Sequence, residues 1–276
     1  MDKYISTNTS SFFAFNIWSI ESAKAVMDGA FKMQRDVILQ TSVKAFDFLD
    51  KSALRWFVDK YRREKGIQIY LHLDHSKSLE LIREAIYYGW DSVMIDASDQ
   101  PLEENIRRTN EVCAFVRKQN KDILVEAEIG QIGTVGDEIF TAKANVARIE
   151  DIKQFVQNVD IDLLAVAIGT SHGQYLCKPS LRYDLIDQTG SITNLPLVIH
   201  GGTGLTDEMF LRLLSYKNVK KINVSTDVKL AFRQGIKNCI QNGFMEEKGF
   251  NPICITGMLH DSIENMTMNK LKLLRD

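Results

Sequence analysis

The chain has 276 residues, of which 45% are hydrophobic and 25% charged, a balance typical of a globular protein with an ample core. Its formal net charge of -2 excludes the strongly basic surface that a nucleic-acid partner requires. No apolar run reaches the roughly 18 residues needed to span a bilayer, and the opening residues lack the pattern of a signal peptide, so we expect no membrane partner.

Eight short β-rich runs recur along the whole chain. Most are nearly continuous apolar stretches, as is typical of parallel strands that are covered on both faces. Antiparallel surface strands would alternate more regularly between apolar and polar residues. The runs begin, in chain order, at Phe12, Asp36, Ile67, Ser92, Asp122, Leu163, Leu195 and Lys220.

Helical patterns lie between these runs. Ser19 precedes one apolar stripe as a suitable N-cap, a second stripe ends before Gly89, and Thr206 caps a third helix whose first turn is acidic. Eight strand–helix units in about 250 residues predict one TIM barrel over residues 1–276. The alternative, a doubly wound sheet, would need a Gly-rich first turn, which the sequence lacks.

Polar side chains are concentrated where the predicted strands end. In a TIM barrel these ends meet at one face, and that face carries the active site. The residues at or just after these ends are Asp74, His75, Asp96, Ser98, Glu126, Glu128, His172, His200, Asn223, Ser225 and Thr226. We therefore predict a polar site at one end of the barrel.

Three of the five histidines, His75, His172 and His200, fall at or after separate strand ends. Imidazoles converging from different strands favour a divalent metal such as Zn²⁺, with one coordination position left for substrate. The alternative is that each is an isolated core or capping residue. We prefer that alternative for His72, which lies earlier on its strand, and for His260, which lies outside the strands.

A glycine-rich turn and a hydroxyl-rich turn follow the last two strands. The segments "HGGTGL" at 200–205 and "NVSTDVK" at 223–229 each lead into a predicted helix. Glycines allow close approach of the backbone, and helix N-termini bind phosphate through free N–H groups and the helix dipole. The loops after strands seven and eight are the usual phosphate site of TIM barrels. Two tight turns with ordinary helix caps are the alternative.

The acidic strand ends have two interpretations. Asp96 could cap the helix that follows it, and Glu126 could pair with a lysine. Their expected position opposite three histidines favours a role in metal or substrate binding.

Taken together, these segments resemble the class II, zinc-dependent aldolases that act on ketose bisphosphates. The resemblance runs in order along nearly the whole chain, and the combination of segments is more specific than any one of them. It implies a TIM barrel that assembles into homodimers or homotetramers. The segments are "FAFNI" at 13–17, "HLDH" at 72–75, "MIDAS" at 94–98, "VEAEIG" at 125–130, "AIGTSHGQY" at 167–175, "HGGTG" at 200–204 and "NVST" at 223–226.

The resemblance also implies roles for the matching residues. His75, His172 and His200 would bind the catalytic Zn²⁺, Asp74 would transfer a proton, and Asp96 and Glu126 would match a second or alternate metal position. A monovalent cation, Na⁺ or K⁺, would lie near the substrate phosphate. Dihydroxyacetone phosphate would be held by Gly173, Gly201, Gly202, Thr203, Asn223, Val224, Ser225 and Thr226.

The chemistry of aldol cleavage agrees with these roles. Cleavage of a carbon–carbon bond beside a ketone leaves an enediolate, and a Zn²⁺ Lewis acid can hold that charge without a Schiff-base lysine. Asp74 would exchange a proton with the oxygen at the cleaved bond. In the family a second acid lies on a mobile loop after the fifth strand, for which Glu138 is the candidate and Asp137 the alternative.

Two departures from the family concern the second substrate. Ser76 stands where glycine is common, and "LQTSVKAFDFLD" at 39–50 differs from the family's small-residue loop. The resemblance implies cleavage of a fructose-type or tagatose-type 1,6-bisphosphate to dihydroxyacetone phosphate and glyceraldehyde 3-phosphate, and these departures leave the identity of the sugar open. Another ketose phosphate or a sugar-acid phosphate remains an alternative, as do a non-catalytic phosphosugar-binding barrel and a different metal-dependent barrel enzyme. The four cysteines form no CxxC pair, which predicts a reduced, cytoplasmic protein.

Overall fold

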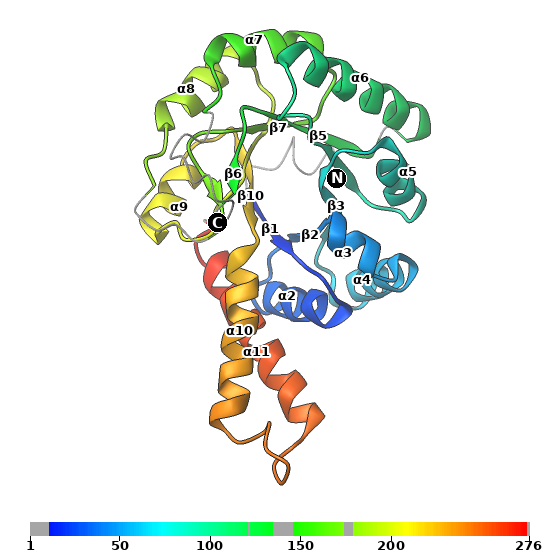
Figure 1. Ribbon diagram of the computed structural model, residues 1–276, viewed down its shortest axis with the longest axis vertical. Helices are drawn as coiled ribbons and strands as arrows, with labels where there is room; N and C mark the ends of the chain where they lie inside the picture. The colour runs from blue at the N-terminus through cyan, green and yellow to red at the C-terminus, as the bar shows by residue number, and fades with distance from the viewer. Residues whose placement is uncertain (1–10, 121, 135–145, 174–178, 275–276) are drawn as a thin grey trace.

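Eight parallel strands close into a barrel, in the order β1-β10-β9-β7-β5-β4-β3-β2 (Figure 1). The computed structural model describes residues 11–120, 122–134, 146–173 and 179–274. The strands are β1 (Phe12–Asn16), β2 (Val37–Ser42), β3 (Ile69–Ser76), β4 (Ser92–Ile95), β5 (Leu124–Ile129), β7 (Leu163–Val166), β9 (Leu197–Ile199) and β10 (Val219–Val224). The predicted TIM barrel is confirmed, and each predicted β-rich run overlaps one barrel strand.

Helices surround the barrel and cover the outer faces of its strands (Figure 1). Ser19 and Thr206 cap their helices through their side chains, as predicted, and Gly89 follows its helix with a φ of 82°. None of the described helices is long and apolar enough to cross a membrane. The helices are α2 (Ile20–Lys32), α3 (Val43–Phe48), α4 (Lys51–Lys65), α5 (Leu79–Tyr87), α6 (Leu102–Gln119), α7 (Ile149–Asn158), α8 (Tyr183–Ile192), α9 (Asp207–Leu214), α10 (Thr226–Gln241) and α11 (Pro252–Leu271).

The barrel interior is apolar at the amino-terminal ends of the strands. Successive side chains of a strand point to opposite faces, so every second residue faces the barrel axis. The inward residues at this end form a closed cluster, separate from the larger core between the strands and the helices. Its members are Phe12, Ala14, Ile38, Tyr70, Leu124, Leu163, Ala165 and Val198.

A short parallel pair, β6 (Gly133–Thr134) and β8 (Ser171–His172), lies outside the barrel sheet. It joins the segment after β5 to the segment after β7, and places the backbone of His172 beside that of Thr134. The sequence did not predict this pair, because two-residue strands carry no periodic pattern.

Candidate active site

The end of β3 contains a β-bulge that accounts for its unusual sequence. Leu73 pairs with Val93 and Ser76 pairs with Ile95, so two residues of β3 stand opposite one residue of β4. The extra residue is His75, which has a φ of 51°, in the left-handed region that non-glycine residues rarely adopt. Such a conformation costs on the order of 1–3 kcal/mol and is concentrated at functional sites. It releases Asp74 and His75 from strict alternation at the mouth of the barrel.

His75 is oriented by Asp96, from the end of β4. Its Nδ1 lies 2.7 Å from Oδ2 of Asp96, whose other oxygen accepts hydrogen bonds from the Ser98 backbone N–H at 3.1 Å and hydroxyl at 2.7 Å. Burial alone would lower the pKa of His75, but the carboxylates of Asp74 and Asp96 outweigh it and raise that pKa to about 10. The surroundings of this imidazole therefore favour a positive charge.

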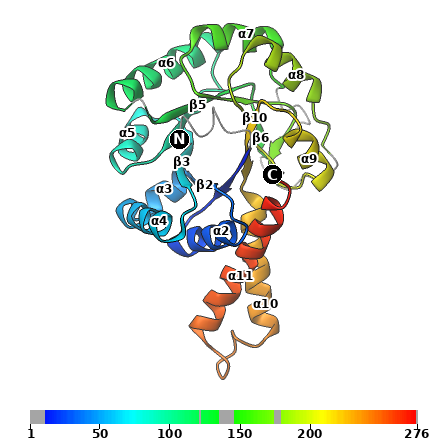
Figure 2. The same cartoon turned by 180° about the vertical axis from the view of Figure 1, so that it is seen from behind.

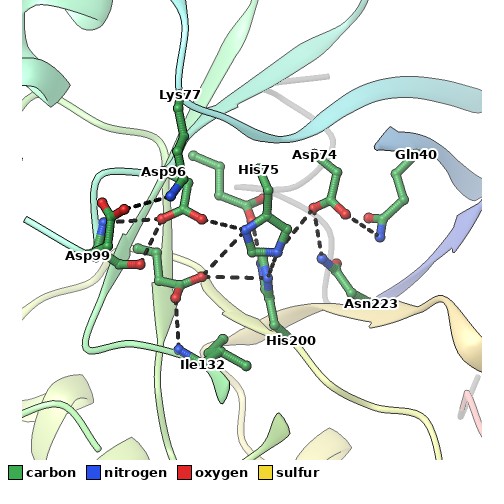
Figure 3. Close-up of polar contacts among 12 residues, drawn as sticks. Gln40, Asp74, His75, Lys77, Asp96, Asp99, Ile132, His200 and Asn223 are labelled. Atoms are coloured by element: carbon green, nitrogen blue, oxygen red, sulfur yellow. Dashed lines mark hydrogen bonds and ion pairs between the residues drawn. The ribbon is translucent and has the colours of Figure 1, made fainter. Parts of the chain in front are cut away.

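His200, at the end of β9, faces His75 directly (Figure 3). Nδ1 of His200 lies 3.0 Å from Nε2 of His75, and the two rings are nearly perpendicular. Nε2 of His200 is 2.8 Å from Oε1 of Glu126. Each imidazole thus has one nitrogen against a carboxylate and the other directed at the space between the two rings.

Glu126 lies in a buried charged group that includes Lys221. Nζ of Lys221 is 2.7 Å from Oε2 of Glu126, and both side chains are fully buried. Burial would raise the pKa of Glu126, but Lys221 and the neighbouring histidines hold it well below its usual range. His72 completes the group: its Nδ1 is 2.6 Å from the Ser92 hydroxyl, and burial lowers its pKa to about 3. The prediction of a core role for His72 agrees with this position.

Glu128, also from β5, lies near both site histidines. Its Oε1 accepts a hydrogen bond from the Ile132 N–H at 3.2 Å. Its buried Oε2 has no hydrogen-bond partner among the described residues, and lies 3.7 Å from Nδ1 of His200 and 4.0 Å from Nδ1 of His75. Burial raises the pKa of Glu128 to about 7.

These donors fit a divalent metal. Two nitrogens that each bind Zn²⁺ at about 2.0–2.1 Å lie roughly 3.3 Å apart in a tetrahedral site. The 3.0 Å separation in the chain is close to that distance. Each imidazole also has the carboxylate partner that metal-binding histidines usually have. At this end of the barrel, two sets of ligand atoms among the described residues are grouped closely enough to hold an ion, namely Asp74, His75 and His200, and His75, Asp96 and Glu128.

Asp74 is held by amide groups from three other strands, of which Figure 3 shows those of Gln40 and Asn223. Gln40 donates to its Oδ2 at 3.3 Å, Asn16 donates to the same oxygen at 3.5 Å, and Asn223 donates to Oδ1 at 3.4 Å. Burial would raise the pKa of Asp74, but His75, His200 and Lys221 hold it below its ordinary value. Asp74 is therefore a fixed, ionised carboxylate whose Oδ1 lies 3.9 Å from Nε2 of His75.

The glycine-rich turn after β9 packs tightly against its surroundings. A Cβ atom on Gly201, which has a φ of 68°, would lie 2.6 Å from the Ser171 carbonyl oxygen. The Thr203 hydroxyl accepts a hydrogen bond from the Asp227 N–H at 3.3 Å, in the first turn of α10. This contact joins the turn after β9 to the start of α10.

Two adjoining cavities open beside these groups. One of about 610 Å³ is bordered by Asp74, His75, Asp96 and Glu128 and extends outward to Ser42, Lys77, Gln131 and Lys229. A small cavity of about 20 Å³ is lined by Asn16, Gln40, Asp74, Gly173, Gly201, Gly202, Thr203, Asn223 and Ser225. Asp74, Gly173 and Ser225 border both, so the two form a continuous site.

Most of the predicted site residues that the structure describes meet at this mouth. Three do not line its cavities. The side chain of Val224 is fully buried in the core, and both oxygens of Glu126 are taken by Lys221 and His200 beneath the site. His200 is fully buried too, and it reaches the site through Nδ1, which lies 3.0 Å from Nε2 of His75. For Val224 the reason is strand alternation, and for Glu126 the reason is that Glu128 occupies the next inward position. The side chain of His172, and residues Asp137 and Glu138, lie outside the described part of the structure.

Residues that the sequence did not single out complete the site: Asn16, Gln40 and Lys221. Each lies at a position that faces the barrel axis. The alternation of inward and outward strand positions could have identified them.

Comparison with known proteins agrees with the fold and the site. Residues 2–276 match the family model described as fructose-bisphosphate aldolase class-II. This chain belongs to the class II fructose-bisphosphate aldolase family. It is therefore an aldolase, a carbon–carbon lyase, as the sequence resemblance implied.

The individual proteins that this chain resembles are named as different aldolases. The chain is 33% identical, over 86% of its length and 80% of the relative's, to a 6-phospho-5-dehydro-2-deoxy-D-gluconate aldolase of Shouchella clausii (strain KSM-K16). Its fold resembles that of the YdjI aldolase from Escherichia coli K12, with a TM-score of 0.81, 24% identity, and coverage of 99% of this chain and 94% of the other. It also resembles a fructose-bisphosphate aldolase from Campylobacter jejuni, with a TM-score of 0.78, 20% identity, and coverage of 99% and 92%.

Proposed function

We propose that this class II aldolase cleaves a phosphorylated keto sugar to dihydroxyacetone phosphate and an aldehyde, with a zinc ion held by His75, His172 and His200. The observation that carries the proposal is the pair of imidazole nitrogens 3.0 Å apart beside the fixed carboxylate of Asp74. When bound, the zinc ion would supply Lewis-acid stabilisation of the negative charge that develops on the ketone oxygen. Glu128, with its unpartnered oxygen, is a better second or alternate ligand than Glu126, and it shares this role with Asp96.

Asp74 is the proposed proton-transfer group. In cleavage, its carboxylate would take the proton from the hydroxyl group at the bond that breaks, and in condensation it would return that proton to the aldehyde oxygen. The three amide donors around it fix its direction, and the positive charges of His75, His200 and Lys221 favour the ionised carboxylate. Glu138, or Asp137, remains the proposed acid that exchanges the proton on the carbon of dihydroxyacetone phosphate.

The small cavity is the proposed site for dihydroxyacetone phosphate. Gly201, Gly202 and Thr203 supply backbone and hydroxyl groups from the turn after β9, and Asn223 on β10 and Ser225 before α10 also line the cavity. Thr226, the first residue of α10, lines the adjoining large cavity. Helix N-termini favour phosphate, and close backbone approach requires residues without a bulky side chain. Gly173 borders the same space, and a Na⁺ or K⁺ ion near the phosphate completes the proposal.

The second product depends on the outer part of the large cavity. A fructose-type or tagatose-type bisphosphate would leave glyceraldehyde 3-phosphate there. The 33% identical relative favours a second candidate, a sugar acid whose cleavage gives dihydroxyacetone phosphate and a three-carbon aldehyde that carries a carboxylate. Both distal groups are anionic, and Lys77 and Lys229 are among the residues that line this cavity.

A coupled assay for dihydroxyacetone phosphate tests this proposal. It is run on fructose 1,6-bisphosphate, tagatose 1,6-bisphosphate and 6-phospho-5-dehydro-2-deoxy-D-gluconate, before and after treatment with EDTA and again after addition of zinc. We expect zinc-restored cleavage of at least one substrate, and the ratio of kcat/KM values identifies the distal group. Full activity in the EDTA-treated protein, or cleavage of none of the three, would contradict the proposal.

A further inference from the structure

Lys221 is, among the residues that the structure describes, the one lysine whose side chain is fully buried. Removing a charged group from water costs free energy even when the group is paired, and an interior ion pair stabilises a fold little compared with apolar side chains of the same size. Lys221 also borders neither of the two cavities, so it is not placed to touch a substrate. Its contacts therefore indicate its role.

The ammonium group of Lys221 contacts one carboxylate across the barrel. Lys221 lies on β10 and Glu126 on β5, two strands that β9 and β7 separate in the barrel (Figures 1 and 2). Nζ of Lys221 is 2.7 Å from Oε2 of Glu126, whose Oε1 is 2.8 Å from Nε2 of His200. The chain of contacts thus runs from the ammonium group through a carboxylate to an imidazole whose other nitrogen faces His75.

Asp96, the carboxylate behind the other site imidazole, is anchored in a different way. Its Oδ1 accepts hydrogen bonds from the backbone N–H and the hydroxyl group of Ser98, two residues further along the chain. Glu126 has no such local donor among the described residues, and its oxygens have Lys221 and His200 as their hydrogen-bond partners. Lys221 therefore does for Glu126 what Ser98 does for Asp96.

A competing donor lies beside Glu126. Nε2 of fully buried His72 has no hydrogen-bond partner among the described residues and lies 3.7 Å from Oε2 of Glu126. Nδ1 of His72 is 2.6 Å from the Ser92 hydroxyl. When that hydroxyl donates to Nδ1, Nε2 carries the proton of the ring. Without Lys221, Glu126 can rotate toward this N–H group, and the rotation takes its other oxygen away from His200.

We propose that Lys221 is a positioning residue that fixes Glu126 and, through it, the direction of the His200 imidazole at the proposed zinc site. This inference rests on that site as described under the proposed function. Buried partners of metal-binding histidines orient the imidazole, and their loss typically lowers metal affinity by about 10–100-fold. Lys221 thus acts from beneath the site through two side chains, without contact to substrate.

The zinc affinities of metal-stripped proteins test this chain of contacts. We expect Lys221→Met to raise the zinc dissociation constant by about 10–100-fold. Lys221→Met/Glu126→Gln should bind zinc more tightly than the single variant, because the neutral amide needs no cation and its oxygen can still accept a hydrogen bond from His200. Leu163→Ala, which removes a fully buried side chain from the apolar cluster at the other end of the barrel, is the control for lost stability. It should bind zinc as the wild type does.

The visible absorption of the cobalt-substituted proteins is the second readout. Co²⁺ binds to sites with the same nitrogen and oxygen ligands, and the geometry of those ligands determines its absorption. Lys221→Met saturated with cobalt should absorb differently from the wild type, whereas the spectrum of Leu163→Ala should coincide with that of the wild type. If Lys221→Met does not fold, Lys221→Gln, whose side chain is shorter than lysine, replaces it with the same expected results.

Either a wild-type zinc affinity or a wild-type cobalt spectrum in Lys221→Met would overturn the inference, as would equal zinc affinities in the single and double variants. His200→Ala, measured alongside, separates this result from failure of the zinc site itself. Wild-type zinc affinity in His200→Ala would contradict the proposed site and the role of Lys221 with it. Weak zinc binding in His200→Ala, together with unchanged binding in Lys221→Met, would contradict the role of Lys221 alone.

Discussion

Two layers of the barrel interior are built on the same strands but differ completely in chemistry. At the amino-terminal end the inward residues are apolar, as at Ile38, Leu124 and Val198. Two residues further along the same strands stand Gln40, Glu126 and His200, all buried and polar. The lower layer fills a closed space with apolar side chains, whereas the upper layer has to balance every buried charge with a partner.

The contrast separates the residues that stabilise the barrel, in the apolar layer, from those that serve its chemistry, in the polar layer. Buried apolar side chains stabilise a fold by roughly 1.5–3 kcal/mol each. Buried charges stabilise it little, because the cost of removing them from water offsets their mutual attraction. Their concentration at one end of this barrel is therefore explained by the chemistry of the site. The following substitutions test whether the two layers are as independent as this comparison implies.

The largest effect on activity is expected at Asp74. Asp74→Asn keeps the shape of the side chain but removes the proton acceptor, so kcat should fall by about 10²–10⁴-fold, the range of general acid–base catalysis. Zinc affinity and melting temperature, measured on the same preparation, should stay near the wild-type values. Retention of full turnover would show that another group transfers the proton.

Lys221→Met should cause the largest loss of stability. It leaves Glu126 buried without its cation, which costs about 3–5 kcal/mol of unfolding free energy. The double variant Lys221→Met/Glu126→Gln removes both charges and should recover part of that loss in urea unfolding. If the single variant unfolds at the same urea concentration as the wild type, the ion pair is not the element that stabilises the upper layer.

Leu163→Ala tests the lower layer. Deleting this fully buried side chain should lower the unfolding free energy by about 2–5 kcal/mol, because it leaves a cavity in the apolar cluster. Zinc affinity, measured by equilibrium dialysis of the folded protein, should be unchanged. A parallel loss of zinc binding would mean that the two layers are coupled.

Asp96→Asn should have the smallest effect. It weakens the contact that orients His75, and the loss of such an outer partner typically lowers metal affinity by about 10–100-fold. The fold should remain intact, since Asp96 lies at the mouth of the barrel. A much larger loss, with zinc absent even at high concentration, would indicate that Asp96 is itself a principal ligand.

The sequence was sufficient to predict the strands but not the details of the site. Continuous apolar runs predicted all eight barrel strands, because parallel strands are covered on both faces. The β-bulge at His75 was not predictable, since a single left-handed residue leaves no periodic signal. The proposed preference for Glu128 over Glu126 as an alternate ligand could not be predicted from the sequence either, because both face the barrel axis and only their partners, Ile132 and Lys221, distinguish them.

Zinc titration of the metal-stripped protein, followed by release of dihydroxyacetone phosphate, tests the central claim most directly. The assignment predicts that activity of the wild type rises in proportion to added zinc and reaches its maximum at one equivalent per chain. His200→Ala, which removes one of the two facing nitrogens, should remain inactive throughout the titration. Activity that is independent of zinc, or a full zinc response in His200→Ala, would contradict the assignment of the polar layer as a metal-dependent aldolase site.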